Sequence, residues 1–268
     1  MADQTERLAN LRKWNIGIGG LHLVQGILIL VLSTSFAIPI VATVMTGPPG
    51  GEGSLSVTKH FFDFNFPIAI ALFLFLAAGD HLLTSVTPLR SWYERNLLHG
   101  INYARWIEYS VSASIMIVLI ALLNGINNLY AIIAIFGVNA AMILFGLVME
   151  QVNRNRESVN WLPFIFGCIA GIVPWIAIVI GLVTSSTDNT MINGVPANSE
   201  GVPTFVYFIV ISLFLLFNCF ALNQWLQYRG KGKFTDYLYG EKVYLVLSLV
   251  AKSALAWQIF GGTLASPS

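Results

Sequence analysis

Seven apolar segments, each long enough to supply the roughly 20 residues of a membrane-spanning helix, dominate the chain. We place them at about 14–45, 61–86, 98–123, 128–150, 160–184, 204–228 and 240–263. Only 10% of the 268 residues are charged, compared with roughly 25% in soluble domains. The apolar runs are continuous rather than alternating, which argues against a membrane β-barrel. We therefore expect an all-α protein, a single seven-helix bundle over 1–268, that crosses the cell membrane several times.

Basic residues gather on alternate connecting segments. Eleven of the 14 lysines and arginines lie on one set: Arg7, Arg12, Lys13, Arg90, Arg95, Arg154, Arg156, Arg229, Lys231, Lys233 and Lys242. The opposite set carries only Lys59. Because basic residues stay on the cytoplasmic side, we expect a cytoplasmic N-terminus and an extracellular C-terminus. The outer connections 46–60 and 185–203, rich in Gly, Pro and Asn, are either flexible loops or a packed cap.

Five of the ionisable residues within the apolar segments stand out: Lys252, Glu108, Asp80, His22 and His81. Lys252 is roughly 18 Å and Glu108 roughly 15 Å from the cytoplasmic end of its helix, at 1.5 Å per residue. His22 lies at a similar depth, and His81 lies a few residues above the cytoplasmic end of its helix. Asp80 precedes His81 and faces about 100° away, toward a neighbouring helix or the headgroups. Ionisable residues within a membrane are costly and usually functional, so we expect the other four to form one polar cluster.

Lys252 has three interpretations. Snorkelling to the surface is difficult, because about ten apolar or small residues flank it on each side and its side chain reaches only ~6 Å. A structural ion pair with Glu108 is the second interpretation. The third is covalent chemistry, since a buried lysine readily forms a Schiff base with an aldehyde. In that case Glu108 is the natural counter-ion, and the histidines either pack as hydrogen-bonded residues or handle protons.

Two short stretches carry a resemblance to retinal proteins. The third segment reads "INYARWIEYSVSASIM" and the last reads "SLVAKSALAWQ". A midplane lysine in the seventh helix, with Arg105 three residues before Glu108, is similar to the microbial rhodopsins. Ser248 stands where proton pumps usually have an aspartate, and Leu119 stands where they often have a proton-donor carboxylate.

The reversed orientation, the single glutamate, the histidines in the first two helices and the long first outer loop together resemble the heliorhodopsins. The resemblance implies covalently bound all-trans retinal on Lys252, with Glu108 as the only counter-ion. It implies a polar cluster of His22, His81 and Ser248 near the Schiff base.

The resemblance also suggests which residues contact the chromophore. It makes Asn139 a pocket residue. Ser112 and Met116 follow Glu108 at four-residue steps, so they share its helix face and would lie along the chromophore, with Tyr109 as a further candidate. The sixth segment has no tryptophan before Trp225, near its cytoplasmic end. Phe217 or Phe220 would take the place of the tryptophan that pumps use there.

We therefore expect a photoreceptor that signals without transporting ions, with no enzymatic activity. "TPLRSWYERN" and "YRGKGKFTDYLYGEK" would form the output surface toward an unidentified cytoplasmic signalling partner, or serve only as topology signals. The small residues of "GVNAAMILFG" favour close helix packing and a homodimer. No basic tract suggests nucleic acid. The alternatives are a light-driven or light-gated ion transporter, and a membrane protein with a structural Lys252–Glu108 pair and no chromophore.

Overall fold

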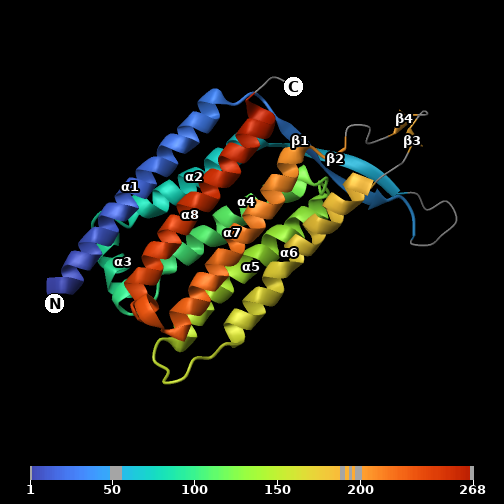
Figure 1. Cartoon of the computed structure of the whole chain (residues 1–268). Coiled ribbons are helices and arrows are strands. Elements are labelled where there is room, and N and C mark those ends of the chain that lie inside the picture. The colour runs from blue at the N-terminus through green and yellow to red at the C-terminus, as the bar shows by residue number, and fades with distance from the viewer. Residues whose placement is uncertain (1, 49–55, 188–190, 193–194, 197–200, 266–268) are drawn as a thin grey trace.

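The computed structural model describes residues 2–48, 56–187, 191–192, 195–196 and 201–265. Within these residues, seven helices are long and apolar enough to cross a membrane. They are α1 (Ala2–Leu32), α2 (Phe66–Leu83), α4 (Tyr103–Leu123), α5 (Leu129–Asn153), α6 (Leu162–Thr187), α7 (Thr204–Arg229) and α8 (Tyr237–Ile259), which continues into the π-helical turn η2 (Phe260–Leu264). The expectation of a seven-helix membrane bundle is confirmed (Figure 1).

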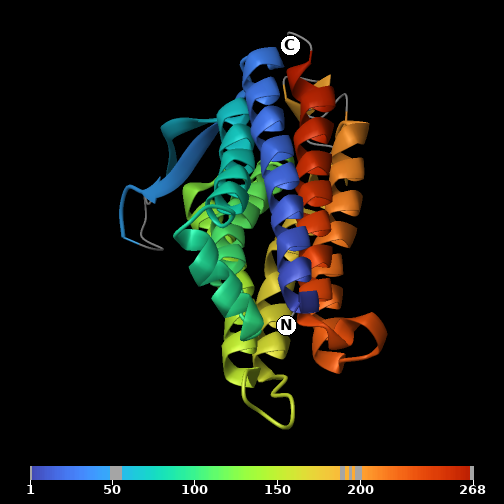
Figure 2. The same cartoon turned by 90° about the vertical axis from the view of Figure 1, so that its left-hand side faces the viewer.

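Shorter elements lie at the two ends of the bundle. One end carries the antiparallel hairpin of β1 (Ala37–Met45) and β2 (Ser56–Asn65), together with the two-residue strands β3 (Met191–Ile192) and β4 (Val195–Pro196). The opposite end carries α3 (Leu89–Leu98) and the 3-10 turn η1 (Gly232–Thr235), close to where α1 begins (Figures 1 and 2). The expected basic connections therefore lie at the end with α3 and η1.

The predicted bounds of the first two helices are wrong. Residues 37–45, assigned to the first helix, form β1, and residues 61–65, assigned to the second helix, belong to β2. Helix α1 ends at Leu32, before Ser33, Thr34 and Ser35. The hydropathy pattern did not predict these strands, because an apolar run rich in β-branched residues is compatible with either a helix or a buried strand. The outer connection 46–60 is thus partly strand, and its residues 49–55, like 188–190, 193–194 and 197–200 of the second connection, lie outside the described residues.

Polar side chains mark where several helices begin. The side chains of Asn65, Asn102, Asn128 and Asp236 each accept a hydrogen bond from a backbone N–H in the first turn of α2, α4, α5 and α8. Such caps satisfy backbone donors that have no partner within the helix. Gly230 ends α7 with a φ of 57°, a conformation that glycine adopts without strain.

The apolar core lies toward the hairpin end of the bundle. It joins Phe66 and Phe73 of α2, Ile117 and Ile120 of α4, and Leu255 of α8, all of which are fully buried. The outward face of α6 instead exposes apolar side chains, among them Ile165, Ile169, Ile176 and Ile180. An exposed apolar face of this extent is unusual for a soluble protein and suits contact with lipid.

Candidate functional site

Lys252 of α8 and Glu108 of α4 form a buried ion pair. The Lys252 Nζ donates to Glu108 Oε1 at 2.8 Å and to Oε2 at 3.0 Å, and it also contacts Ser248 Oγ at 3.3 Å. The same nitrogen lies 4.9 Å from the centre of the Tyr109 ring. Both charged side chains are almost inaccessible to solvent. Removing charges from water is costly, and this geometry offsets part of that cost by pairing them.

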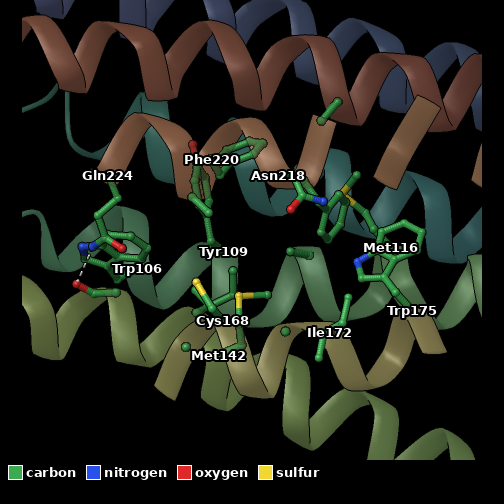
Figure 3. Close-up of a pocket in the computed structure, with 18 of the residues that line it drawn as sticks. Trp106, Tyr109, Met116, Met142, Cys168, Ile172, Trp175, Asn218, Phe220 and Gln224 are labelled. Carbon is green, nitrogen blue, oxygen red and sulfur yellow. Dashed lines mark hydrogen bonds between the residues drawn. The ribbon is translucent and has the colours of Figure 1, made fainter. Parts of the chain in front are cut away.

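A cavity of about 180 Å³ lies beside the lysine. Its wall is built from α4, α5, α6, α7 and α8, and it includes Lys252 and Ser248. Most of the wall is apolar, and it contains seven aromatic side chains: Trp106, Tyr109, Phe164, Trp175, Phe214, Phe217 and Phe220 (Figure 3). An apolar cavity with a few polar groups at defined positions is typical of small-molecule sites.

Five of the six predicted pocket residues line this cavity: Tyr109, Ser112, Met116, Phe217 and Phe220. Within the described residues, the buried hydroxyl of Ser112 has no hydrogen-bond partner. Asn139 is buried but is absent from the cavity wall, and its Nδ2 donates to Ser114 Oγ of α4 at 3.1 Å. The roles of all six toward a chromophore stay predictions.

His22 of α1 and His81 of α2 stack on each other, with ring centres 5.9 Å apart and ring planes 11° apart. Both are buried, and in the described structure no direct hydrogen bond joins either to Lys252 or Glu108.

His81 Nδ1 donates to Asn15 Oδ1 at 2.9 Å, and Asn15 Nδ2 donates to Tyr93 Oη at 3.4 Å. Burial raises the pKa of Tyr93 above its ordinary value, so this phenol stays neutral.

Asp80 lies close to the histidine pair. One of its carboxylate oxygens is 3.8 Å from His81 Nδ1, and its side chain is 15% exposed. Asp80 therefore has a polar neighbour on its own helix.

Two tryptophans in the cavity wall escaped the sequence analysis. Trp175 of α6 contacts Phe214 and Phe217 of α7 edge to face, with ring centres 5.2 and 5.6 Å apart. Trp106 of α4 lies at the other end of the cavity, beside Gln224 (Figure 3). In the sequence, both look like ordinary apolar helix residues, and only their neighbours in space distinguish them.

A second buried ion cluster was also missed. Arg105 pairs with both Glu150 of α5 and Glu241 of α8, and it makes no ion pair with Glu108 in the described structure. All three side chains are buried. The two glutamates lie near the ends of their helices, where a sequence position suggests a solvated headgroup region. Their burial is accompanied by hydrogen bonds from Arg105 and Asn102 to both glutamates, and from Trp106 and Tyr237 to Glu150.

The residues around Lys252 are suitable for retinal. Lys252 brings a buried amine to the cavity wall, Glu108 places a carboxylate in contact with that amine, and the adjoining aromatic cavity is suited to a long apolar chain. A membrane-spanning helical bundle with a buried lysine–carboxylate pair beside an aromatic cavity has the features expected of a retinal protein of the rhodopsin class.

The chain belongs to the heliorhodopsin family: the family model described as Heliorhodopsin matches residues 11–264. The resemblance found in the sequence is thereby confirmed. Members of this family are photoreceptor-like membrane proteins that bind retinal. A search of curated proteins gave no match.

Proposed function

We propose that this chain is a photoreceptor in which Lys252 holds all-trans retinal as a Schiff base and Glu108 is its counter-ion. The observation that carries the proposal is the contact of 2.8 Å between Lys252 Nζ and Glu108 Oε1, at the wall of the aromatic cavity. A positive charge at this depth needs a nearby negative charge, since water does not stabilise it there. When bound, retinal supplies absorption of visible light and a change of shape upon illumination.

The remaining residues have supporting roles in this proposal. Ser248 accepts a hydrogen bond from the lysine nitrogen and helps to orient it. Tyr109 presents its ring to the same nitrogen and donates its hydroxyl hydrogen to the carbonyl oxygen of Tyr244, which holds the ring in place. Trp175, Phe217 and the other aromatic side chains exclude water from the cavity. His22 and His81 form the polar surroundings on the side of α1 and α2.

The apolar core supports signalling rather than ion transport. Beyond Glu108, helix α4 buries Met116, Ile117, Leu119 and Ile120 against neighbouring helices, toward the hairpin end. An ion crossing this mostly apolar layer would lose hydration that few polar groups could replace. A light-driven transporter needs a continuous polar route, and the Arg105 cluster supplies polar groups only in the other half of the bundle.

We further propose that α1 begins on the cytoplasmic side, where the basic connections, α3 and η1 would face a cytoplasmic signalling partner. Eleven basic residues of this end support the orientation. A homodimer is the proposed oligomeric state, supported by the small residues along α5 that permit close helix contacts.

The test is expression of the chain in the presence of all-trans retinal. The purified protein is expected to be coloured, and Lys252→Ala should abolish the visible absorption band. Lys242→Ala is the matched control, because this lysine lies on the same helix but over the Trp14 ring rather than at the cavity. A colourless parent, or a Lys252→Ala variant that stays coloured after washing, would contradict the proposal.

A further inference from the structure

Trp106 contacts both the cavity and the second ion cluster. Its ring forms part of the cavity wall at the end marked by Gln224 (Figure 3). On the other side, its Nε1 donates a hydrogen bond of 2.7 Å to Glu150 Oε2. The whole side chain is buried. A single rigid side chain therefore links the cavity wall to a charged group that does not line that cavity.

The indole has little room to move independently. A Cβ atom at Gly146 of α5 would lie within 2.3 Å of the Trp106 ring, so the ring packs directly against this part of the helix backbone. The Arg105 guanidinium lies 4.4 Å from the ring centre, and the Tyr244 ring lies edge-on at 5.8 Å. Since the ring is confined on these sides, a displacement from the cavity side would alter its hydrogen bond to Glu150.

Glu150 accepts hydrogen bonds from several residues of the cluster and its surroundings. Besides the Trp106 indole, it accepts hydrogen bonds from the Asn102 backbone N–H at 2.9 Å, the Tyr237 hydroxyl at 3.1 Å and the Arg105 guanidinium. Arg105 in turn pairs with Glu241. The cluster thus connects α4, α5 and α8. Because these charges are buried, each hydrogen bond to Glu150 contributes strongly to where its carboxylate lies.

The cluster also leads to the surface at the basic end of the bundle. Glu150 and Tyr237 line a second cavity of about 190 Å³, whose other walls include Arg154, Phe234 and Thr235. Tyr237 begins α8, and only Asp236 separates it from the end of η1. A change in the hydrogen bonds of Glu150 would therefore act on the segment that connects α7 to α8.

We propose that Trp106 is a positioning residue that couples occupancy of the aromatic cavity to the Arg105–Glu150–Glu241 cluster, and through Tyr237 to the basic end of the bundle. The inference rests on the proposed function for the identity of the occupant, retinal. Coupling between two sites is reciprocal. Filling the cavity changes the hydrogen bonding of Glu150, and changing Glu150 alters the environment of the occupied cavity.

The first experiment observes Trp106 directly. The chain carries seven tryptophans, and all of them are labelled by incorporating 5-fluorotryptophan. The fluorine resonance of Trp106 is the one that disappears in Trp106→Phe, or the one left unassigned after the other six tryptophans have each been replaced by phenylalanine. We expect this resonance to shift when the protein without retinal is converted to the retinal-bound protein in the dark. We also expect the substitution Glu150→Gln to shift the Trp106 fluorine resonance, separately from the shift that retinal causes. A Trp106 resonance that stays unchanged while the protein becomes coloured would overturn the inference.

The second experiment follows Glu150 by infrared difference spectroscopy between the retinal-free and retinal-bound protein. Glu150→Gln identifies the carboxylate band of this residue. Trp106→Phe keeps an aromatic ring but removes the N–H donor, so the Glu150 band difference should lose most of its amplitude. Trp175→Phe, at the opposite end of the cavity, is the matched control and should retain it. Full amplitude in Trp106→Phe would overturn the coupling, whereas a protein that never becomes coloured would contradict the proposed function itself.

Discussion

Arg105 and Glu108 lie one turn apart on α4, yet they belong to two separate ion pairs. Glu108 contacts Lys252, while Arg105 contacts Glu150 and Glu241. The negative charge of Glu108 is therefore not shared with the nearest arginine in the sequence. Lys252 is its direct partner, and this separation underlies the first prediction.

Glu108→Gln should change both the colour and the pH titration of the retinal-bound protein. Removing the negative charge beside a protonated Schiff base destabilises its protonated form. We expect absorption to shift to the red while the Schiff base is protonated, and deprotonation to occur at lower pH than in the parent. Substitutions of His22 or His81 should have smaller spectral effects. If the spectrum and titration stay unchanged in Glu108→Gln, the counter-ion is another group, and Asp80 is the next to test.

Arg105→Gln should destabilise the protein far more than Glu241→Gln. Loss of Arg105 leaves two buried carboxylates without their cation, whereas loss of one carboxylate leaves a balanced pair. Breaking a buried pair in this way costs about 3–5 kcal/mol. Thermal unfolding of both variants in detergent tests this order. Arg90→Gln is the control, because its pair with Glu94 is only partly buried and should be worth at most about 1 kcal/mol. Equal losses for all three variants would refute the charge-balance argument.

Gly146→Ala should destabilise the protein by about 1–3 kcal/mol, because the added methyl group overlaps the Trp106 ring. Gly137→Ala on the same helix has open space around the added atom. That control should be neutral or stabilise the helix by up to about 1 kcal/mol. The measurement is the unfolding temperature of each variant. A neutral Gly146→Ala would show that the Trp106 ring is not confined by α5.

A reporter active only in the cytoplasm should work when fused to the N-terminus and fail when fused to the C-terminus. The expectation follows from the eleven basic residues on one set of connecting segments. The reverse activity pattern would contradict the proposed orientation. Retinal binding does not depend on this outcome.

Illumination of cells that express the protein should cause no sustained pH change in the medium and no steady photocurrent. The buried core that includes Ile117, Leu119 and Leu255 is mostly apolar, so it would stabilise a crossing ion poorly. The measurements are the pH of a lightly buffered cell suspension and the current of voltage-clamped cells. A light-induced pH change that a protonophore abolishes would favour the transporter over the signalling protein.

Part of the site could be predicted because depth along a helix follows from residue number. Counting at 1.5 Å per residue brings Lys252 and Glu108 to overlapping depths, and their long apolar flanks exclude most exposed arrangements. The four-residue spacing of Ser112 and Met116 after Glu108 likewise specifies one helix face, and both line the cavity. Asn139, which only the family resemblance suggested as a pocket residue, donates its amide to Ser114 instead of lining the cavity.

The sequence by itself determined that the chain crosses the membrane, how many helices do so, and that Lys252 and Glu108 lie deep within them. Those properties depend on local composition and on the distance of a residue from its helix ends. Tertiary structure alone decided that 37–45 and 56–65 pair as strands, that Arg105 joins Glu150 and Glu241, and that Trp106 and Trp175 face one cavity. Each of these depends on contacts between residues far apart in the chain, and periodicity within a single segment does not specify which distant side chains will meet.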